Sequence, residues 1–123
     1  YAFKNVNQLI STVEAELREG VTNWEIIAAS FPMGSMTGAP KVSAMELAER
    51  FEKVAREVYS GSVGYITPEG DFDFNVVIRS IALNRKKGVA TLHVGGAITI
   101  LSDALQEYEE CLLKAESVLK AAK

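Results

Sequence analysis

The apolar residues near the N-terminus recur at the three- and four-residue intervals of an amphipathic helix. The positions are Val6, Leu9, Ile10, Val13 and Leu17. Residues 12–17 also alternate between apolar and polar, which is the pattern of a strand, so both structures remain open for this stretch. Further along, Thr22 and Glu25 form a capping-box pattern, which predicts a short helix that ends at about Ser30.

A longer amphipathic pattern predicts a helix over about residues 40–57. Its expected buried face consists of Ala44, Leu47, Ala48, Phe51 and Val54. At the other end of the chain, Ser102 or Asp103 is expected to cap a last helix that extends to about Ala121.

Between these helices, alternating residues predict three strands, over about residues 59–67, 72–83 and 89–101. Proline, glycine and charged residues at 68–70 and 85–88 supply the two turns. In the second strand Phe72, Phe74, Val76 and Ile78 share one face. The order of elements predicts an α+β fold in which an antiparallel β-meander has helices on one side.

Composition narrows the class of protein. A chain of 123 residues forms one domain, and a net charge of −3 provides no basic face for a nucleic acid. Cys111 is the single cysteine, so a disulfide framework is excluded. No stretch reaches the length of a membrane span, and we expect a cytoplasmic protein.

The run Gly34-Ser35-Met36-Thr37-Gly38-Ala39-Pro40-Lys41 lies where the long helix begins. Unpaired backbone N–H groups at a helix N-terminus can bind an anion, and glycines allow a ligand to approach the backbone closely. A helix start without a ligand has the same features, so this run does not by itself decide between the two.

Three charged residues of the last helix share one face, namely Glu107, Glu110 and Lys114. Steps of three and seven residues place them within an arc of roughly 60°. Two carboxylates at this spacing can bind Mg²⁺, and the lysine suits an anionic substrate. The alternative is a solvated face with a Glu110–Lys114 pair. Because the three charged residues share one face, Leu105, Leu112 and Leu119 can be buried on another face of the helix.

Other candidates lie on the predicted strands. Arg79 is suited to a bidentate contact with a carboxylate, and an internal partner such as Asp73 is the alternative. Gly95 and Gly96 indicate a bulge or a close approach of a ligand to the backbone. Tyr59 is either a ligand contact or a core tyrosine. His93, the single histidine, fits an edge or half-buried strand position, so we assign it no catalytic role.

Together these segments resemble the chorismate-utilising enzymes over nearly the whole chain. The matching segments are 34–41 with Ala44-Met45-Glu46, then 59–65, 70–73, Ile78-Arg79-Ser80, Gly95-Gly96, and Ser102 through Glu107, Glu110 and Lys114. Within the family, Thr37-Gly38-Ala39-Pro40-Lys41 resembles aminodeoxychorismate synthase component I and anthranilate synthase component I. The preceding Phe31-Pro32 resembles the former most.

The resemblance implies roles for individual residues of the substrate site. Tyr59 and Arg79 would hold the carboxylate end of chorismate, and Ser35 would line the site of the ring. The backbone N–H groups of Gly95 and Gly96 would donate to a substrate carboxylate.

On the last helix, the resemblance implies that Glu110 binds Mg²⁺ and that Glu107 is its neighbouring carboxylate. Lys114 would lie near the substrate carboxylate. The site residues that the resemblance gives thus coincide with the candidates found from the residues themselves.

Three departures from the family pattern stand out. Gln8 replaces a histidine that acts on the leaving hydroxyl in many members, and an amide cannot transfer a proton in its place. Ala97 replaces the third glycine of the glycine-rich strand. The Pro-Ile-x-Gly-Thr segment and the other Mg²⁺ carboxylates of the family are absent, so residues 1–123 match the C-terminal portion of a chorismate-binding catalytic domain.

The activity implied is the conversion of chorismate and ammonia to 4-amino-4-deoxychorismate, in the biosynthesis of para-aminobenzoate and folate. A glutamine amidotransferase partner would supply the ammonia. The alternatives are a part of an anthranilate, isochorismate or salicylate synthase, or a non-catalytic module with a vestigial anion site. We expect the chain alone to be inactive and to form a homo-oligomer.

Overall fold

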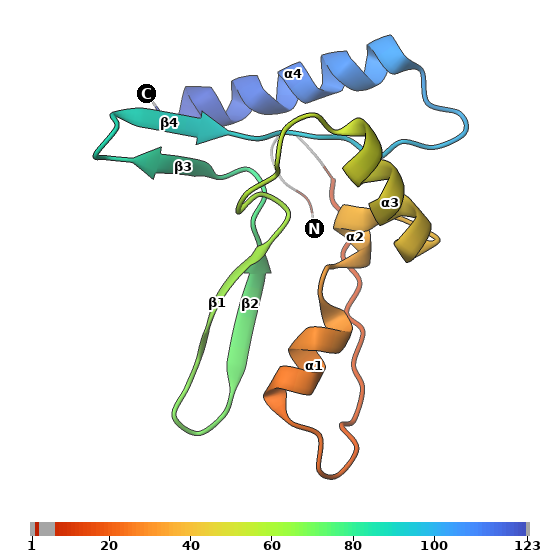
Figure 1. The fold of residues 1–123 in the computed structure, drawn as a ribbon, viewed down its shortest axis with the longest axis vertical. Helices are drawn as coiled ribbons and strands as arrows, with labels where there is room; N and C mark the ends of the chain where they lie inside the picture. The colour runs from red at the N-terminus through yellow and green to blue at the C-terminus, as the bar shows by residue number, and fades with distance from the viewer. Residues whose placement is uncertain (1, 3–6, 123) are drawn as a thin grey trace. The chain divides into compact units, whose positions relative to one another are not determined.

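The computed structural model describes residues 2 and 7–122 and is shown in Figure 1. It contains two compact units, Tyr1–Phe31 and Pro32–Lys123, and each is described by itself. Val6, the first apolar position of the N-terminal pattern, lies outside the described residues.

In the first unit, the stretch at 8–18 forms neither the helix nor the strand that its pattern allowed. Leu9 and Val13 are 95% and 92% exposed, so no apolar surface packs against them. Short helices in water are stable only when such a face is covered. An antiparallel bridge joins Ala2 to Asn7.

The helix α1 (Asn23–Ser30) begins at the predicted capping box. The backbone N–H of Glu25 donates to the Thr22 hydroxyl over 3.3 Å, and the backbone N–H of Thr22 donates to the Glu25 carboxylate over 2.8 Å. The bond from the Thr22 backbone lowers the pKa of Glu25, because it stabilises the ionised carboxylate. Local hydrogen bonding therefore fixes this helix start, as predicted.

The glycine-rich run of the second unit forms a one-turn helix, α2 (Gly34–Thr37), and α3 (Lys41–Phe51) follows it. Gly38 joins the two helices with φ of 135°. A Cβ atom at Gly38 would lie 2.9 Å from the Cβ of Ala44, so only glycine allows this approach. The end of α3 at Phe51 corrects the prediction of a helix to residue 57, and beyond it Val54 is 70% exposed.

The structure has two separate antiparallel hairpins in place of the predicted three-stranded meander (Figure 1). The strands β1 (Ser62–Ile66) and β2 (Phe72–Val76) pair with each other, as do β3 (Ile81–Asn84) and β4 (Val89–Leu92). The fold class of antiparallel strands with flanking helices is confirmed, while the extents of the strands differ from the prediction.

The predicted second strand is interrupted between β2 and β3. The N–H of Ile78 donates to the Val76 carbonyl over 3.0 Å, which turns the chain, and Arg79 has φ of +50°. A strand requires negative φ, so pairing cannot continue through Arg79. The predicted third strand likewise ends early, at Leu92.

The last helix, α4 (Ala104–Ala121), has the predicted extent. Of the two cap candidates, Asp103 is the cap, and its carboxylate accepts from the backbone N–H groups of Leu105 and Gln106 over 3.1 and 3.0 Å. Among the described residues, no helix is both long and apolar enough to cross a membrane.

None of the described residues is buried. The expectation that Leu105, Leu112 and Leu119 are buried is wrong for this chain, because they are 64%, 52% and 52% exposed. The side of α4 that is half-buried carries instead Glu107, Cys111, Lys114, Ala115 and Val118. The apolar side chains of the hairpins and helices therefore lack the covering that normally stabilises them.

From this exposure we predict that the isolated chain self-associates at micromolar concentration. Val63 and Tyr65 on β1 are each 62% exposed, and contiguous apolar surface of this kind is rare on monomers. Light scattering should give a mass of a dimer or larger, and Val63→Lys should reduce it. Glu69→Lys, in the turn after β1, is the matched control, and a monomeric wild-type chain without dye-binding apolar surface would contradict the prediction.

Candidate functional site

The segment at Gly95 and Gly96 is where candidate residues of three different parts of the second unit meet. Lys114 on α4 donates from its ammonium group to the Gly95 carbonyl over 3.0 Å. A Cβ atom at Gly95 would lie 2.8 Å from the hydroxyl oxygen of Tyr59. The glycine thus lies in close contact with Tyr59 and is held to α4 by Lys114.

This arrangement differs from the sequence prediction in two respects. Gly95 and Gly96 follow β4 instead of lying within a strand, because pairing ends at Leu92. The contact with Lys114 uses the Gly95 carbonyl, whereas the predicted substrate contact uses backbone N–H groups. The close neighbour of Gly95 is the Tyr59 side chain of the chain itself, and the predicted approach of a ligand stays a prediction.

The charged face of α4 is organised by two short contacts. The Lys114 ammonium lies 2.6 Å from a Glu110 carboxylate oxygen, so the pair expected for a solvated face is present. The Ser102 hydroxyl donates to Glu107 over 2.6 Å, and a Cβ atom at Gly96 would lie 2.9 Å from the other oxygen of that carboxylate. The Glu107 carboxylate therefore faces Gly96, whereas Glu110 is linked to Gly95 only through Lys114.

The same two carboxylates could contribute to a metal site. Carboxylate oxygens are the ligands that Mg²⁺ prefers, and this ion commonly completes its shell with water and substrate oxygens. In the part of the chain that the structure describes, no group of three or more histidine, cysteine, aspartate or glutamate side chains is close enough to hold a metal. Among the described residues, Glu107 and Glu110 therefore do not complete a metal site, and a site that included them would need further ligands.

Tyr59 also contacts the single histidine. The ring centroids of Tyr59 and His93 are 5.7 Å apart at an interplanar angle of 40°. Both residues are half-buried, which agrees with the half-buried position predicted for His93. His93 directly follows β4 and lies two residues before Gly95, and its ring contacts the Tyr59 ring.

Arg79 lies in the connection between β2 and β3, and this corrects its predicted place on a strand face. Its side chain is exposed, and within the described residues no ion pair joins it to Asp73 or another carboxylate. A non-glycine residue with φ of +50° is uncommon, and such strain concentrates at ligand sites. The guanidinium is thus available to an anion from outside the chain.

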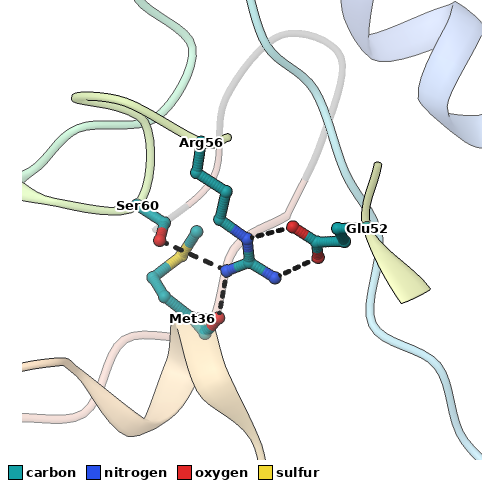
Figure 2. Close-up of polar contacts among 4 residues, drawn as sticks. All are labelled: Met36, Glu52, Arg56 and Ser60. Carbon is teal, nitrogen blue, oxygen red and sulfur yellow. Dashed lines mark hydrogen bonds and ion pairs between the residues drawn. The ribbon is translucent and has the colours of Figure 1, made fainter. Parts of the chain in front are cut away.

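Ser35 is exposed on α2. The residue after it, Met36, belongs to a cluster of four hydrogen bonds made by Arg56, which the sequence did not predict (Figure 2). Arg56 donates from Nη1 to the Met36 carbonyl over 2.8 Å and to the Ser60 hydroxyl over 3.2 Å. Its Nε donates to Glu52 over 2.7 Å, and Nη2 donates to the second carboxylate oxygen of the same residue. We call this arrangement the Arg56 clamp.

The Glu52–Arg56 pair shifts the pKa of both partners. The hydrogen bond from Arg56 lowers the pKa of Glu52, and the same bond raises that of Arg56. Since the pKa of Glu52 is lowered by folding, the pair's stabilisation is complete above the ordinary value of 4.5 and is lost as the pH falls through the lowered value. The clamp is therefore intact at neutral pH.

A signal for the clamp exists in the sequence. Glu52 and Arg56 are four residues apart at the end of the amphipathic pattern, which reads as an ordinary helical pair. What the spacing cannot show is that α3 ends at Phe51 and that the guanidinium reaches Met36 and Ser60.

Gln8 belongs to the first unit, where its side-chain amide donates to the Leu9 carbonyl over 3.4 Å. The contact is local and does not test the role that the resemblance implied.

At the starts of α2 and α3, in contrast to α1 and α4, no side chain caps the helix. Their first N–H groups are thus not occupied by a capping side chain, which fits both an anion site and a helix start without a ligand.

Comparison with known proteins gives one family. Residues 1–120 match the family described as chorismate binding enzyme. The chain is 45% identical over 119 residues to the aminodeoxychorismate synthase of Streptomyces pristinaespiralis, and 42% identical over 117 residues to the putative aminodeoxychorismate synthase of Schizosaccharomyces pombe. These alignments cover 97% and 95% of this chain and 16% of each relative.

Anthranilate synthase component 1 of Mycobacterium tuberculosis is similar to nearly the same degree. It is 41% identical over 119 residues, which cover 97% of this chain and 23% of the relative. The chain thus spans less than a quarter of the length of each of these three relatives.

From the contact between Gly95 and Tyr59 we predict that Gly95→Ala displaces the tyrosine ring. The added methyl group would lie 2.8 Å from the hydroxyl oxygen, which is closer than nonbonded contact allows. NMR signals of the Tyr59 ring should shift, and Tyr59→Phe should remove most of the effect of Gly95→Ala on thermal stability. Gly34→Ala is the control, because nothing lies within 4 Å of its Cβ position. Equal, additive losses in both backgrounds would contradict the contact.

Proposed function

This chain belongs to the chorismate-binding enzyme family, and we propose that it acts as part of an aminodeoxychorismate synthase component I. The reaction replaces the ring hydroxyl of chorismate with an amino group from ammonia, giving 4-amino-4-deoxychorismate and water. The observation that carries the proposal is that the family-matched residues Tyr59, Gly95 and Lys114 meet at one place in the structure.

The proposed substrate contacts follow from charge and geometry. Chorismate carries two carboxylates, and the ammonium of Lys114 and the guanidinium of Arg79 are suited to bind them. The Tyr59 hydroxyl would donate a hydrogen bond to the same end of the substrate as Arg79. Ser35, exposed on α2, would line the ring site, and the N–H groups of Gly95 and Gly96 would donate to a carboxylate.

Mg²⁺ is the proposed cofactor, with Glu110 as a ligand and Glu107 as its neighbouring carboxylate. When bound, the ion neutralises substrate charge and orients the bound carboxylate. In this chain Lys114 is paired with Glu110, so its ammonium already offsets the charge of one carboxylate. Ammonia would be delivered by a glutamine amidotransferase partner.

A second candidate, anthranilate synthase component I, is supported by sequence identity to nearly the same degree. The Mycobacterium tuberculosis relative of that name is 41% identical, against 42–45% for the two aminodeoxychorismate synthases. The two activities start from the same substrate and differ in product, because anthranilate has lost the enolpyruvyl group as pyruvate.

The proposal is tested by product analysis. The complete protein that carries this segment should convert chorismate, in the presence of Mg²⁺ and ammonia, to 4-amino-4-deoxychorismate identified by mass spectrometry. The 123-residue chain alone should give no measurable product, since it spans 16% of the aminodeoxychorismate synthases that it matches. Anthranilate and pyruvate from the complete protein would establish the second candidate, and no product would refute both.

We further predict that Arg79→Ala in the complete protein lowers kcat/KM for chorismate by roughly 30-fold or more, as expected for loss of a charge-assisted contact worth about 2–5 kcal/mol. Arg79→Lys should recover only part of it, because an ammonium cannot make a bidentate contact. Arg85→Ala, in the turn between β3 and β4, is the control. Unchanged kcat/KM in Arg79→Ala would show that Arg79 does not bind substrate.

A further inference from the structure

We propose that Arg56 is a positioning residue that holds the Ser35 and Tyr59 segments in register with each other. The inference rests on the proposed function, since it assigns a role in binding chorismate. Arg56 itself need not touch the substrate. It contacts the residue that follows each of the two proposed substrate contacts, namely Met36 and Ser60.

The first step of the argument is that one guanidinium nitrogen serves both segments. Nη1 of Arg56 donates to the Met36 carbonyl over 2.8 Å and to the Ser60 hydroxyl over 3.2 Å (Figure 2). These two acceptors are 24 residues apart in the sequence, so no local secondary structure relates them. A displacement of either segment lengthens one of the two bonds.

The second step is that the guanidinium cannot rotate freely. Glu52 binds both Nε and Nη2 of Arg56, which is the bidentate geometry that a carboxylate and a planar guanidinium form. This fixes the plane of the group, and Nη1 is then directed at Met36 and Ser60. Glu52 orients the clamp, and Arg56 makes the connections.

The third step is that the Tyr59 turn is strained and needs such support. Glu57 and Ser60 have φ of +53° and +64°, in the left-handed region that favours glycine. The Arg56 carbonyl accepts from the Tyr59 N–H over 2.9 Å, so Arg56 holds this turn from its backbone as well as from its side chain. Strained turns persist only when several contacts determine them.

The fourth step extends the register beyond Tyr59. The Ser60 N–H donates to the Val77 carbonyl over 3.0 Å, and the Val77 N–H donates to the Gly61 carbonyl over 2.9 Å. Val77 lies two residues before Arg79 in the connection after β2. The turn that Arg56 holds is therefore bonded directly to the segment that presents Arg79.

The experiment compares Arg56→Lys with Lys120→Gln in the complete protein. Lysine keeps the positive charge but has one nitrogen in place of the three that make the clamp. Lys120→Gln breaks the Glu116–Lys120 pair, which has the same four-residue spacing and lies near the end of α4. We expect Arg56→Lys to raise KM for chorismate at least about tenfold with a smaller change in kcat, because substrate contacts are misplaced. Lys120→Gln should leave both constants unchanged.

A double-mutant cycle separates positioning from general stabilisation. If Arg56 acts through the Ser35 segment, the effect of Arg56→Lys on KM should be several-fold smaller in a Ser35→Ala background. A purely structural role would lower the melting temperature while leaving KM unchanged and the two substitutions additive. Either unchanged KM or additivity overturns the proposal.

Different experimental results refute the positioning role of Arg56 and the proposed function. Absence of chorismate turnover in the wild-type complete protein refutes the function. The clamp is tested separately by the amide NMR signals of Thr37 and Gly61, which follow Met36 and Ser60. Arg56→Lys should shift both and Lys120→Gln neither, and a shift of only one signal would show that Arg56 does not connect the segments.

Discussion

The guanidinium of Arg56 is the constraint on which the geometry of the second unit depends most. None of the described residues is buried, so close packing does not fix the positions of its segments. Directional polar contacts hold the segments in place instead. Arg56 connects α2 to the turn before β1, and Glu52 holds the plane of the guanidinium. A charge-assisted network of this kind is about twice as strong per bond as neutral contacts.

The features predicted correctly from the sequence are those that local chemistry determines. The Thr22 capping box and the Asp103 cap need partners only within three residues, and both are present. The turns at 68–70 and 85–88 join paired strands, since Pro68 restricts φ and Gly70 and Gly88 adopt positive φ. The glycine-rich run, together with the other matching segments, indicated the family that the comparisons show.

The features missed are those that depend on distant partners or on backbone strain. Alternation through residues 72–83 predicted one strand, but Arg79 takes a positive φ that no alternation pattern reveals. The amphipathic pattern continued past Phe51, but α3 ends there. The pattern also does not reveal that the Arg56 side chain bonds to the distant residues Met36 and Ser60. Burial was expected for Leu105, Leu112 and Leu119 because they are apolar. Burial also requires a surface that packs against them, and in the described residues all three are exposed.

The lack of burial among residues 2 and 7–122 has a calorimetric consequence. The heat capacity change of unfolding arises mainly from apolar surface that becomes hydrated, and globular proteins show about 12–15 cal/mol/K per residue. Apolar surface that is already hydrated in the folded chain contributes nothing to this change, so Ile100 and Leu101, at 101% and 92% exposed, add none. An uncovered chain of this kind unfolds with a small heat capacity increment over a broad temperature range.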